Sequence, residues 1–191
     1  MKIRTLLTVA LLGAAVTAQA ETQLAAANAD AKPALHHYCD APVYHQLDFW
    51  IGDWDTIDMG DHPDGKGPSI AHAVITPVLD GCALHEKYEQ VNGLIGESYT
   101  LYVPSLKHWH QSWVNNGAGL WLQDGDFKDG VLTLTATTTA KDGSTVHHRI
   151  TWAKQGDGVR ETSVASKDGG KTWAPEFDCL FVKHGTAQSG K

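Results

Sequence analysis

DFWIGDWD occupies residues 48–55, at the point where the character of the chain changes. From Leu47 onward, short runs rich in Val, Ile, Thr, Tyr and Trp alternate with turns that contain Gly, Asp and Asn, about every 8–12 residues. This spacing is typical of β-sandwiches and β-barrels. No amphipathic helix of about ten or more residues is predicted after residue 47, so we expect an all-β domain.

Nine turn clusters separate ten predicted strands. The strands are expected at about 47–58, 69–79, 82–91, 95–103, 108–115, 119–127, 131–140, 144–153, 158–166 and 172–183. Because the connections are short, strands that follow one another should pair antiparallel as a meander. A ten-strand meander can close on itself, which removes its two exposed edges. The predicted fold is therefore a single antiparallel up-and-down β-barrel.

The first twenty residues predict a secretory signal peptide. Lys2 and Arg4 form a basic region ahead of the apolar stretch 6–16. Ala18-Gln19-Ala20 then matches a small-x-small cleavage site. The apolar stretch is too short to span a membrane. We therefore expect an exported protein, located in the periplasm or outside the cell.

The rest of the chain divides into two predicted parts. Residues 21–38 form an Ala-rich segment that is expected to be flexible, and residues 39–185 form the barrel domain. The whole chain has a net charge of −7, and about −9 without the two basic residues of the leader. This acidic surplus argues against nucleic acid or an anionic bilayer as a partner. No second apolar run reaches the length of a transmembrane helix, about 18 residues or more.

Alternation along the strands predicts which side chains face the barrel interior. The candidate ligand-binding residues, which carry polar or aromatic groups on inward faces, are Glu86, Tyr88, Trp109, Gln111, Trp113 and His148. A barrel of this size has room for one small ligand, and large rings beside polar groups orient a flat or apolar one. Alternatively, Trp109 and Trp113 fill the core and Glu86 bonds to a neighbouring side chain, such as Gln111 or Arg160.

Histidine is abundant, with eleven in the chain, but no spacing matches a closed metal site, so no metal is predicted. His148 is the candidate haem ligand because alternation turns it inward, and this rests on analogy with barrels that bind haem. A solvated or hydrogen-bonded role is the alternative for each histidine. Asp53 and Asp55 lie opposite Trp54 and are expected in solvent.

Catalytic motifs are scarce. SKDGGKTW at 166–173 resembles the Asp-box of sialidase propellers, but a propeller needs several boxes and this chain has one. We interpret it as a turn whose side chains bond the backbone. The sequence has no nucleophile elbow, Walker loop, H-E-x-x-H or C-x-x-C motif, so no catalytic residue is predicted.

Gly52-Asp53-Trp54 resembles the Gly-x-Trp of the first strand in calycin barrels. The resemblance implies that Trp54 closes one end of the barrel near a basic residue late in the last strand, a place that Lys183 occupies. Longer blocks extend it over about 39–183: DFWIGDWD, LDGCALHEKYE, LYVPSLKHWHQSWV, HRITW, SKDGGKTW and FDCLF. Together they resemble an uncharacterised bacterial family of secreted calycin-like or lipocalin-like barrels, a domain of unknown function. The resemblance implies a fold and export but no reaction.

Cys39, Cys82 and Cys179 are an odd set, so at most one intramolecular disulfide forms. The family usually has Gly where Cys179 stands, and the resemblance therefore implies a Cys39–Cys82 bridge. Three free thiols, or a bridge to Cys179, are the alternatives. The family also has an aromatic residue near Ser163, and the smaller side chain here could widen the cavity.

We therefore expect an exported barrel that binds a small molecule of unknown identity, with an apolar or aromatic body, in its interior. Two other functions stay open. One is an envelope protein that acts through its outer surface, favoured by a filled core beside an exposed apolar patch. The other is a small hydrolase or isomerase with Glu86 as the base, favoured by a raised pKa of that carboxyl group.

Overall fold

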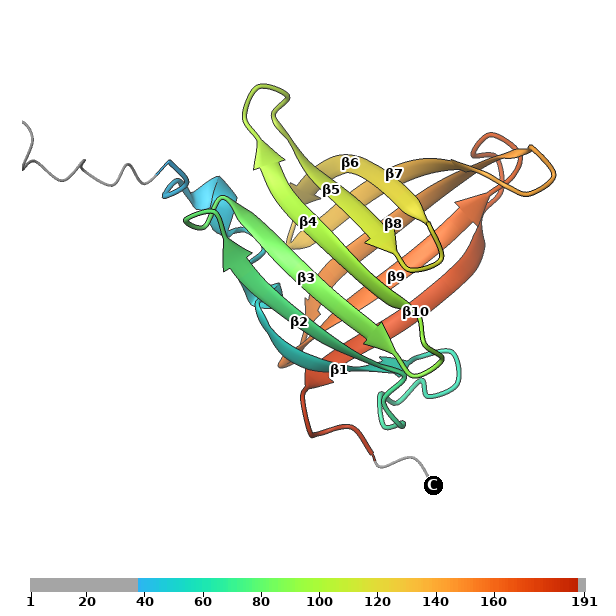
Figure 1. Cartoon of the computed structure of the whole chain (residues 1–191), viewed down its shortest axis with the longest axis horizontal. Helices are drawn as coiled ribbons and strands as arrows, with labels where there is room; N and C mark the ends of the chain where they lie inside the picture. Colours follow the sequence, from blue (N-terminus) through green and yellow to red (C-terminus); the bar gives the residue numbers. More distant parts are fainter. Residues whose placement is uncertain (1–37, 189–191) are drawn as a thin grey trace, which may run out of the picture. The chain divides into compact units, whose positions relative to one another are not determined.

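The computed structural model describes residues 38–188, which form one closed antiparallel β-barrel (Figure 1). Its strands are β1 (Gly52–Asp58), β2 (Ala71–Val78), β3 (Ala83–Gln90), β4 (Ile95–Val103), β5 (His108–Asn115), β6 (Leu120–Lys128), β7 (Val131–Thr139), β8 (Thr145–Gln155), β9 (Gly158–Ser166) and β10 (Ala174–Lys183). Each strand pairs with the next in sequence, and β1 pairs with β10 to close the barrel. The predicted fold class is confirmed. The predicted signal peptide and all but the last residue of the Ala-rich segment lie outside the described residues.

The first predicted strand begins too early. Two short 3₁₀ helices, η1 (Pro42–His45) and η2 (Asp48–Trp50), precede β1, which starts only at Gly52. Leu47 and Trp50 are three residues apart, so one 3₁₀ turn points both side chains to the same side. Both are about 1% exposed and pack into the hydrophobic core. A strand would send these two side chains to opposite faces, and burial of both therefore favours the helical turn.

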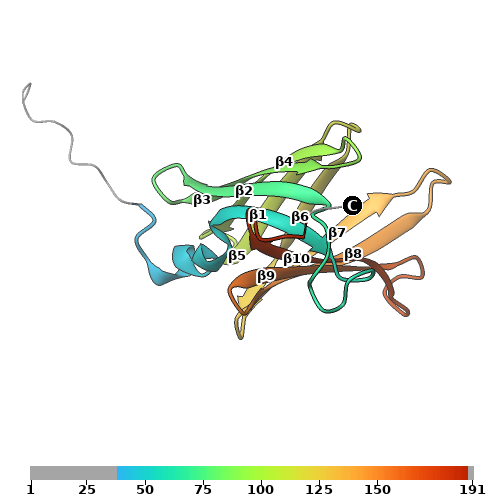
Figure 2. The ribbon, with the colours of Figure 1, turned by 90° about the horizontal axis from the view of Figure 1, so that it is seen from below.

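The core fills the end of the barrel that the two short helices cover. Its fully buried members include Leu47, Trp50, Trp54, Trp109, Leu132, Leu134, Ile150, Trp152, Val159 and Phe181. The helices lie at one end of the ribbon in both views, and the β3–β4, β5–β6, β7–β8 and β9–β10 turns lie at the other (Figures 1 and 2). Among residues 38–188 no helix has the length and hydrophobicity to cross a membrane.

Trp54 is held from three sides. Its indole Nε1 donates a hydrogen bond of 2.9 Å to the Trp50 carbonyl. The Lys183 ammonium lies 3.7 Å from the centre of the ring, because Lys183 is the direct partner of Trp54 in the β1–β10 pair. A Cβ added to Gly52 would lie only 2.7 Å from Trp54 Cε2, so only glycine lets the ring fold back over the strand. These contacts make Trp54 a structural residue.

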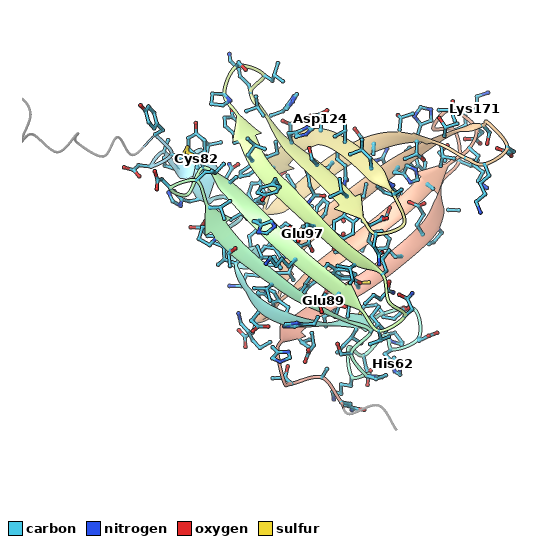
Figure 3. The ribbon with its side chains drawn as sticks, viewed as in Figure 1. His62, Cys82, Glu89, Glu97, Asp124 and Lys171 are labelled. Carbon is cyan, nitrogen blue, oxygen red and sulfur yellow. A yellow bond between two sulfur atoms is a disulfide. The ribbon has the colours of Figure 1, made fainter. Side chains whose placement is uncertain are left out.

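Cys39 and Cys82 form a disulfide, and Cys179 is free. The bridge ties the segment ahead of η1 to the start of β3, at the end of the barrel where Figure 3 labels Cys82. The disulfide that the family resemblance implied is confirmed, and the alternatives with Cys179 are wrong.

The Asp-box forms the turn between β9 and β10. One oxygen of Asp168 accepts hydrogen bonds from the Lys171 and Thr172 amides and the Ser166 hydroxyl, and the other accepts from the Thr172 hydroxyl. The hydrogen bonds from Thr172, Ser166 and Lys171 hold the pKa of Asp168 well below its usual range. The motif therefore organises a turn.

Candidate functional site

The barrel contains a partly open cavity of about 520 Å³ next to the packed core. This volume lies within the range of small-molecule sites, about 300–1,000 Å³. Seven of the ten strands contribute to the lining of the cavity. Their lining residues are Thr56, Asp58, Glu86, Tyr88, Gln90, Gln111, Trp113, Asn115, Trp121, Gln123, Ile150, Trp152, Glu161, Glu176, Phe177, Cys179 and Phe181. Ile70 and Leu94 complete the lining from the β1–β2 and β3–β4 connections. The cavity therefore extends toward the end of the barrel opposite the short helices.

The charge of this lining has one sign. Asp58, Glu86, Glu161 and Glu176 all contribute carboxyl groups, whereas no Lys, Arg or His is among the residues that line the cavity. Polar amides and aromatic rings make up most of the remainder. The cavity is thus suited to a ligand that brings positive charge or hydrogen-bond donors.

Glu86 lies at the centre of β3, with Ser98 of β4 as its direct partner. The Ser98 hydroxyl donates a hydrogen bond of 2.9 Å to Glu86 Oε2, and both residues are buried. Burial raises the pKa of Glu86 to about 7, against the opposing effect of the Ser98 hydrogen bond. A neighbouring strand's side chain therefore bonds Glu86, as the alternative from the sequence held. The partner is Ser98 and neither of the two named there, since Gln111 bonds elsewhere and Arg160 pairs with Asp178.

Glu161 of β9, which is half-buried, is a second carboxyl group of the cavity with a raised pKa. Burial raises its pKa well above the usual range, and the nearby charge of Glu86 raises it further. Two neighbouring carboxyl groups that are shielded from water repel each other when both are ionised. The pair therefore retains a proton near neutral pH. A cation placed between Glu86 and Glu161 would stabilise the ionised forms of both groups.

A chain of side-chain amides crosses three strands on the inner wall. Gln111 Nε2 donates to the Thr100 hydroxyl over 2.9 Å, and Gln123 Nε2 donates to Gln111 Oε1 over 2.8 Å. The chain ends at Gln123 Oε1, which is buried and has no hydrogen-bond partner. Such acceptors are rare in folded proteins, because leaving one unpaired costs about 1–3 kcal/mol. A ligand donor in the cavity could satisfy it.

Aromatic rings form much of the remaining wall. Tyr88 and Trp113 pack edge to face with their ring centres 5.9 Å apart. Burial raises the pKa of the Tyr88 phenol, so its hydroxyl stays protonated and can donate. Burial likewise raises the pKa of the free Cys179 thiol to about 12, which leaves it neutral.

Four of the six predicted ligand-binding residues line the cavity, namely Glu86, Tyr88, Gln111 and Trp113. Trp109 does not, because it lies deeper in the core, where its Nε1 donates to Gln46 Oε1 over 3.0 Å.

His148 is not among the lining residues either. Its Nδ1 lies 2.8 Å from Glu176 Oε2 and its Nε2 lies 2.7 Å from the Thr138 hydroxyl. Its ring packs on Trp121, with the ring centres 4.3 Å apart. With both ring nitrogens engaged, His148 orients Glu176 and offers no free nitrogen to a haem.

Glu161, Glu176, Gln123 and Trp121 line the cavity without having been predicted. Alternation in β6 and β9 could have identified Gln123 and Glu161, since both fall on inward faces. Glu176 could not be found in this way. It sits at an irregularity of the β9–β10 register between Pro175 and Phe177, where the simple alternation of the strand breaks.

The expectation that Asp55 lies in solvent is wrong. Its side chain is only 10% exposed, because the segment after β10 covers it. His184 Nδ1 and the Gly185 amide each lie 2.8 Å from its oxygens. Burial acts to raise the pKa of Asp55, but the hydrogen bonds from His184, Gly185 and Ala187, together with the charge of His184, outweigh it and hold the pKa below its usual range.

No model of a known protein family matches the sequence. A search of curated proteins also finds no match. The function must therefore be inferred from the cavity and its lining.

Proposed function

We propose that this protein, after export, binds a small organic cation with an apolar or aromatic body inside the barrel. The proposal rests on one observation: every charged residue that lines the cavity is an acid. An amine or guanidinium group would lie among these carboxyl groups, and its apolar body would contact the rings. The protein would then be a carrier or receptor of the secreted calycin-like type that its motifs resemble.

Electrostatics favours a cation over a neutral ligand. Without ligand, burial disfavours ionisation of both Glu86 and Glu161. A bound cation stabilises their ionised forms and lets the protons leave. Binding should therefore release protons, and affinity should rise as the pH increases through about 7, the pKa of Glu86.

The rest of the wall suits the same ligand. Cations are attracted to the faces of aromatic rings, and Tyr88, Trp113 and Trp121 line the cavity. The unpaired Gln123 Oε1 can accept a hydrogen bond from an N–H group. The signal peptide that the sequence predicts and the Cys39–Cys82 disulfide both support export, since disulfides persist outside the cytosol.

Three indole compounds that differ mainly in charge test the proposal: tryptamine, tryptophol and indole-3-acetate. Isothermal titration calorimetry of the purified protein at pH 8 should give the tightest binding for tryptamine, about tenfold or more over the other two. Glu86→Gln and Glu161→Gln should each weaken tryptamine binding. Glu97→Gln, on the exposed face of β4, is the matched control. Equal or tighter binding of tryptophol or indole-3-acetate would overturn the preference for a cation.

A general-base function is the second candidate, because the pKa of Glu86, about 7, matches that of a base at neutral pH. Proton abstraction from 5-nitrobenzisoxazole is a suitable probe of a buried carboxylate beside aromatic rings. Turnover at pH 8 that Glu86→Gln abolishes and Glu97→Gln leaves unchanged would support this function. Equal turnover in the wild type and Glu86→Gln would remove Glu86 as the base.

The outer surface has its own apolar residues. The exposed ones on β4, β5 and β6 are Ile95, Tyr99, Val114, Leu120 and Leu122. From the sequence, we expect a protein that acts through its outer surface to show an exposed apolar patch and also a filled core. Because the interior holds a cavity, we prefer a small-molecule ligand.

A further inference from the structure

Two histidines and two aspartates meet on the outside of the barrel, where β1 lies between β2 and β10. His72 Nε2 lies 2.7 Å from Asp53 Oδ1, and His184 Nδ1 lies 2.8 Å from Asp55 Oδ1. The two imidazole rings are neighbours, with centres 4.6 Å apart and planes inclined by 45°. This cluster is separate from the cavity, because none of its members lines the cavity.

The backbone fixes where these side chains stand. Asp53 and Asp55 are two residues apart in β1, so both point away from the interior, opposite Trp54. His72 is the direct partner of Asp55 in the β1–β2 pair. The main-chain amide of His184 donates to the Asp53 carbonyl over 3.0 Å, which anchors the residue that follows β10. Three paired strands thus bring the groups together.

Asp53, His72 and His184 can each offer one ligand atom, and these atoms all lie within 4.8 Å of one another. Zn²⁺ binds imidazole nitrogen and carboxylate oxygen at about 2.0–2.2 Å, which puts the ligand atoms of one ion about 3–3.5 Å apart. Small rotations of these partly exposed side chains would bring the ligand atoms from their present separations, up to 4.8 Å, to the separations that one ion requires. The ion would replace the hydrogen bond between His72 and Asp53.

Asp55 supplies an independent indication of a metal site. Histidines that bind metals almost always use their second nitrogen to bond a carboxylate or carbonyl, which fixes the ring. Asp55 bonds Nδ1 of His184 in this manner, and the Gly185 amide holds the carboxylate in turn. This hydrogen bond leaves Nε2 of His184 as the ring nitrogen available to an ion. A buried carboxylate therefore already orients one of the three ligands.

We propose that Asp53, His72 and His184 bind a divalent transition-metal ion of the Zn²⁺ type on the outer surface of the barrel, oriented by Asp55. Two imidazoles and one carboxylate suit Zn²⁺, Co²⁺, Ni²⁺ or Cu²⁺, whereas Ca²⁺ and Mg²⁺ require mostly oxygen ligands. Three protein ligands leave a fourth position open to water or to a donor from another molecule.

Calorimetric titration of the untagged, chelator-treated protein with ZnCl₂ tests the proposal. We expect one ion per chain in the wild type. The double variant His72→Gln/His184→Gln should lose about 100-fold or more in affinity, since it removes two of three ligands. Asp55→Asn should lose about 10–100-fold, the usual effect of removing the partner of a metal-bound histidine. His85→Gln, which removes a histidine paired with Glu97 on β4, is the matched control and should bind as the wild type does.

Two further measurements make the outcome decisive. Absorbance of the Co²⁺-loaded protein should show the bands of a four- or five-coordinate ion in the wild type and lose them in the double variant. Melting temperatures in chelator should be similar for all variants that are compared, so that lost binding is not lost folding. Equal Zn²⁺ affinity in the wild type and the double variant, or no binding at millimolar Zn²⁺, would overturn the proposal.

Discussion

Lys183 places its ammonium group 3.7 Å from the centre of the Trp54 ring, and the two residues face each other across the strand pair that closes the barrel. The same indole donates to the Trp50 carbonyl in the short helix that covers the barrel end. One side chain therefore links the last strand, the first strand and the helical cap.

Replacing Lys183 with Met should destabilise the barrel by about 0.5–1 kcal/mol, because it removes the cation and keeps an apolar chain of similar length. Urea denaturation followed by tryptophan fluorescence measures the change. Lys154→Met, at an exposed position of β8, is the control and should have little effect. Equal stabilities of the Lys183→Met variant and the wild type would show that the contact between the ammonium group and the Trp54 ring does not stabilise the barrel.

Gly52→Ala should destabilise the fold by about 1–3 kcal/mol, because the new methyl group would meet the Trp54 ring at 2.7 Å. A double-mutant cycle assigns the cause. In a Trp54→Leu background the ring is absent, so the added cost of Gly52→Ala should fall markedly. The same cost in both backgrounds would place the strain in the backbone and not in the ring contact.

The Cys39–Cys82 disulfide closes a loop with a sequence separation of 43 residues. In the chain-entropy account such a loop contributes up to about 4 kcal/mol, so Cys39→Ser/Cys82→Ser should lower the free energy of unfolding by as much. Cys179→Ser removes the free thiol and should change stability far less. If reduction of the wild type leaves its urea midpoint unchanged, the bridge does not constrain the unfolded chain as expected.

Turn residues made the strand pattern predictable. Turn clusters that contain Asn, Gly, Pro or Asp bound β4, β5 and β9, and the predicted limits of these strands agree with the structure. The position of an inward-facing side chain along the barrel axis was harder to predict. Trp109 and Gln111 share an inward face, yet only Gln111 lines the cavity, because alternation gives the face of a residue and not its depth.

Contacts that form only when the barrel closes could not be predicted from the sequence. Asp55 and His184 are 129 residues apart, and only the β1–β10 pair brings them together. Glu161 and Glu86 interact across the interior in the same way, through strands that are far apart in the chain. Local patterns contain no information about such pairs, so the proximity of these carboxyl groups emerges only from the closed barrel.

Asp168→Asn should loosen the β9–β10 turn, because a neutral amide oxygen accepts more weakly from the Lys171 and Thr172 amides and the new NH₂ group cannot accept from the Thr172 hydroxyl. Hydrogen exchange at these two amides should become faster, while exchange in the β7–β8 hairpin stays unchanged. Asp157→Asn, in the β8–β9 turn, is the matched control. Unchanged protection at residues 171 and 172 would contradict a structural role for the motif.

The stability of the ligand-free protein should fall as the pH rises from about 4.5 to about 7. The pKa of Glu86 is 4.5 in an unfolded chain and about 7 in the barrel, so the folded state favours the protonated carboxyl group. Stability from this group is therefore fully present below pH 4.5 and is lost as ionisation proceeds through pH 7. Glu161 titrates in the same direction, because burial also raises its pKa.

Glu86→Gln separates the contribution of Glu86 from that of Glu161. The amide is neutral at every pH and can still accept the Ser98 hydrogen bond, so the variant should resemble the wild type near pH 4.5. At pH 8 it should be more stable, by about 1–3 kcal/mol, since no charge has to be buried. Urea denaturation at both pH values measures this, with Glu97→Gln as the control. A variant that is less stable than the wild type at pH 8 would mean that the cavity already compensates the Glu86 charge without any ligand.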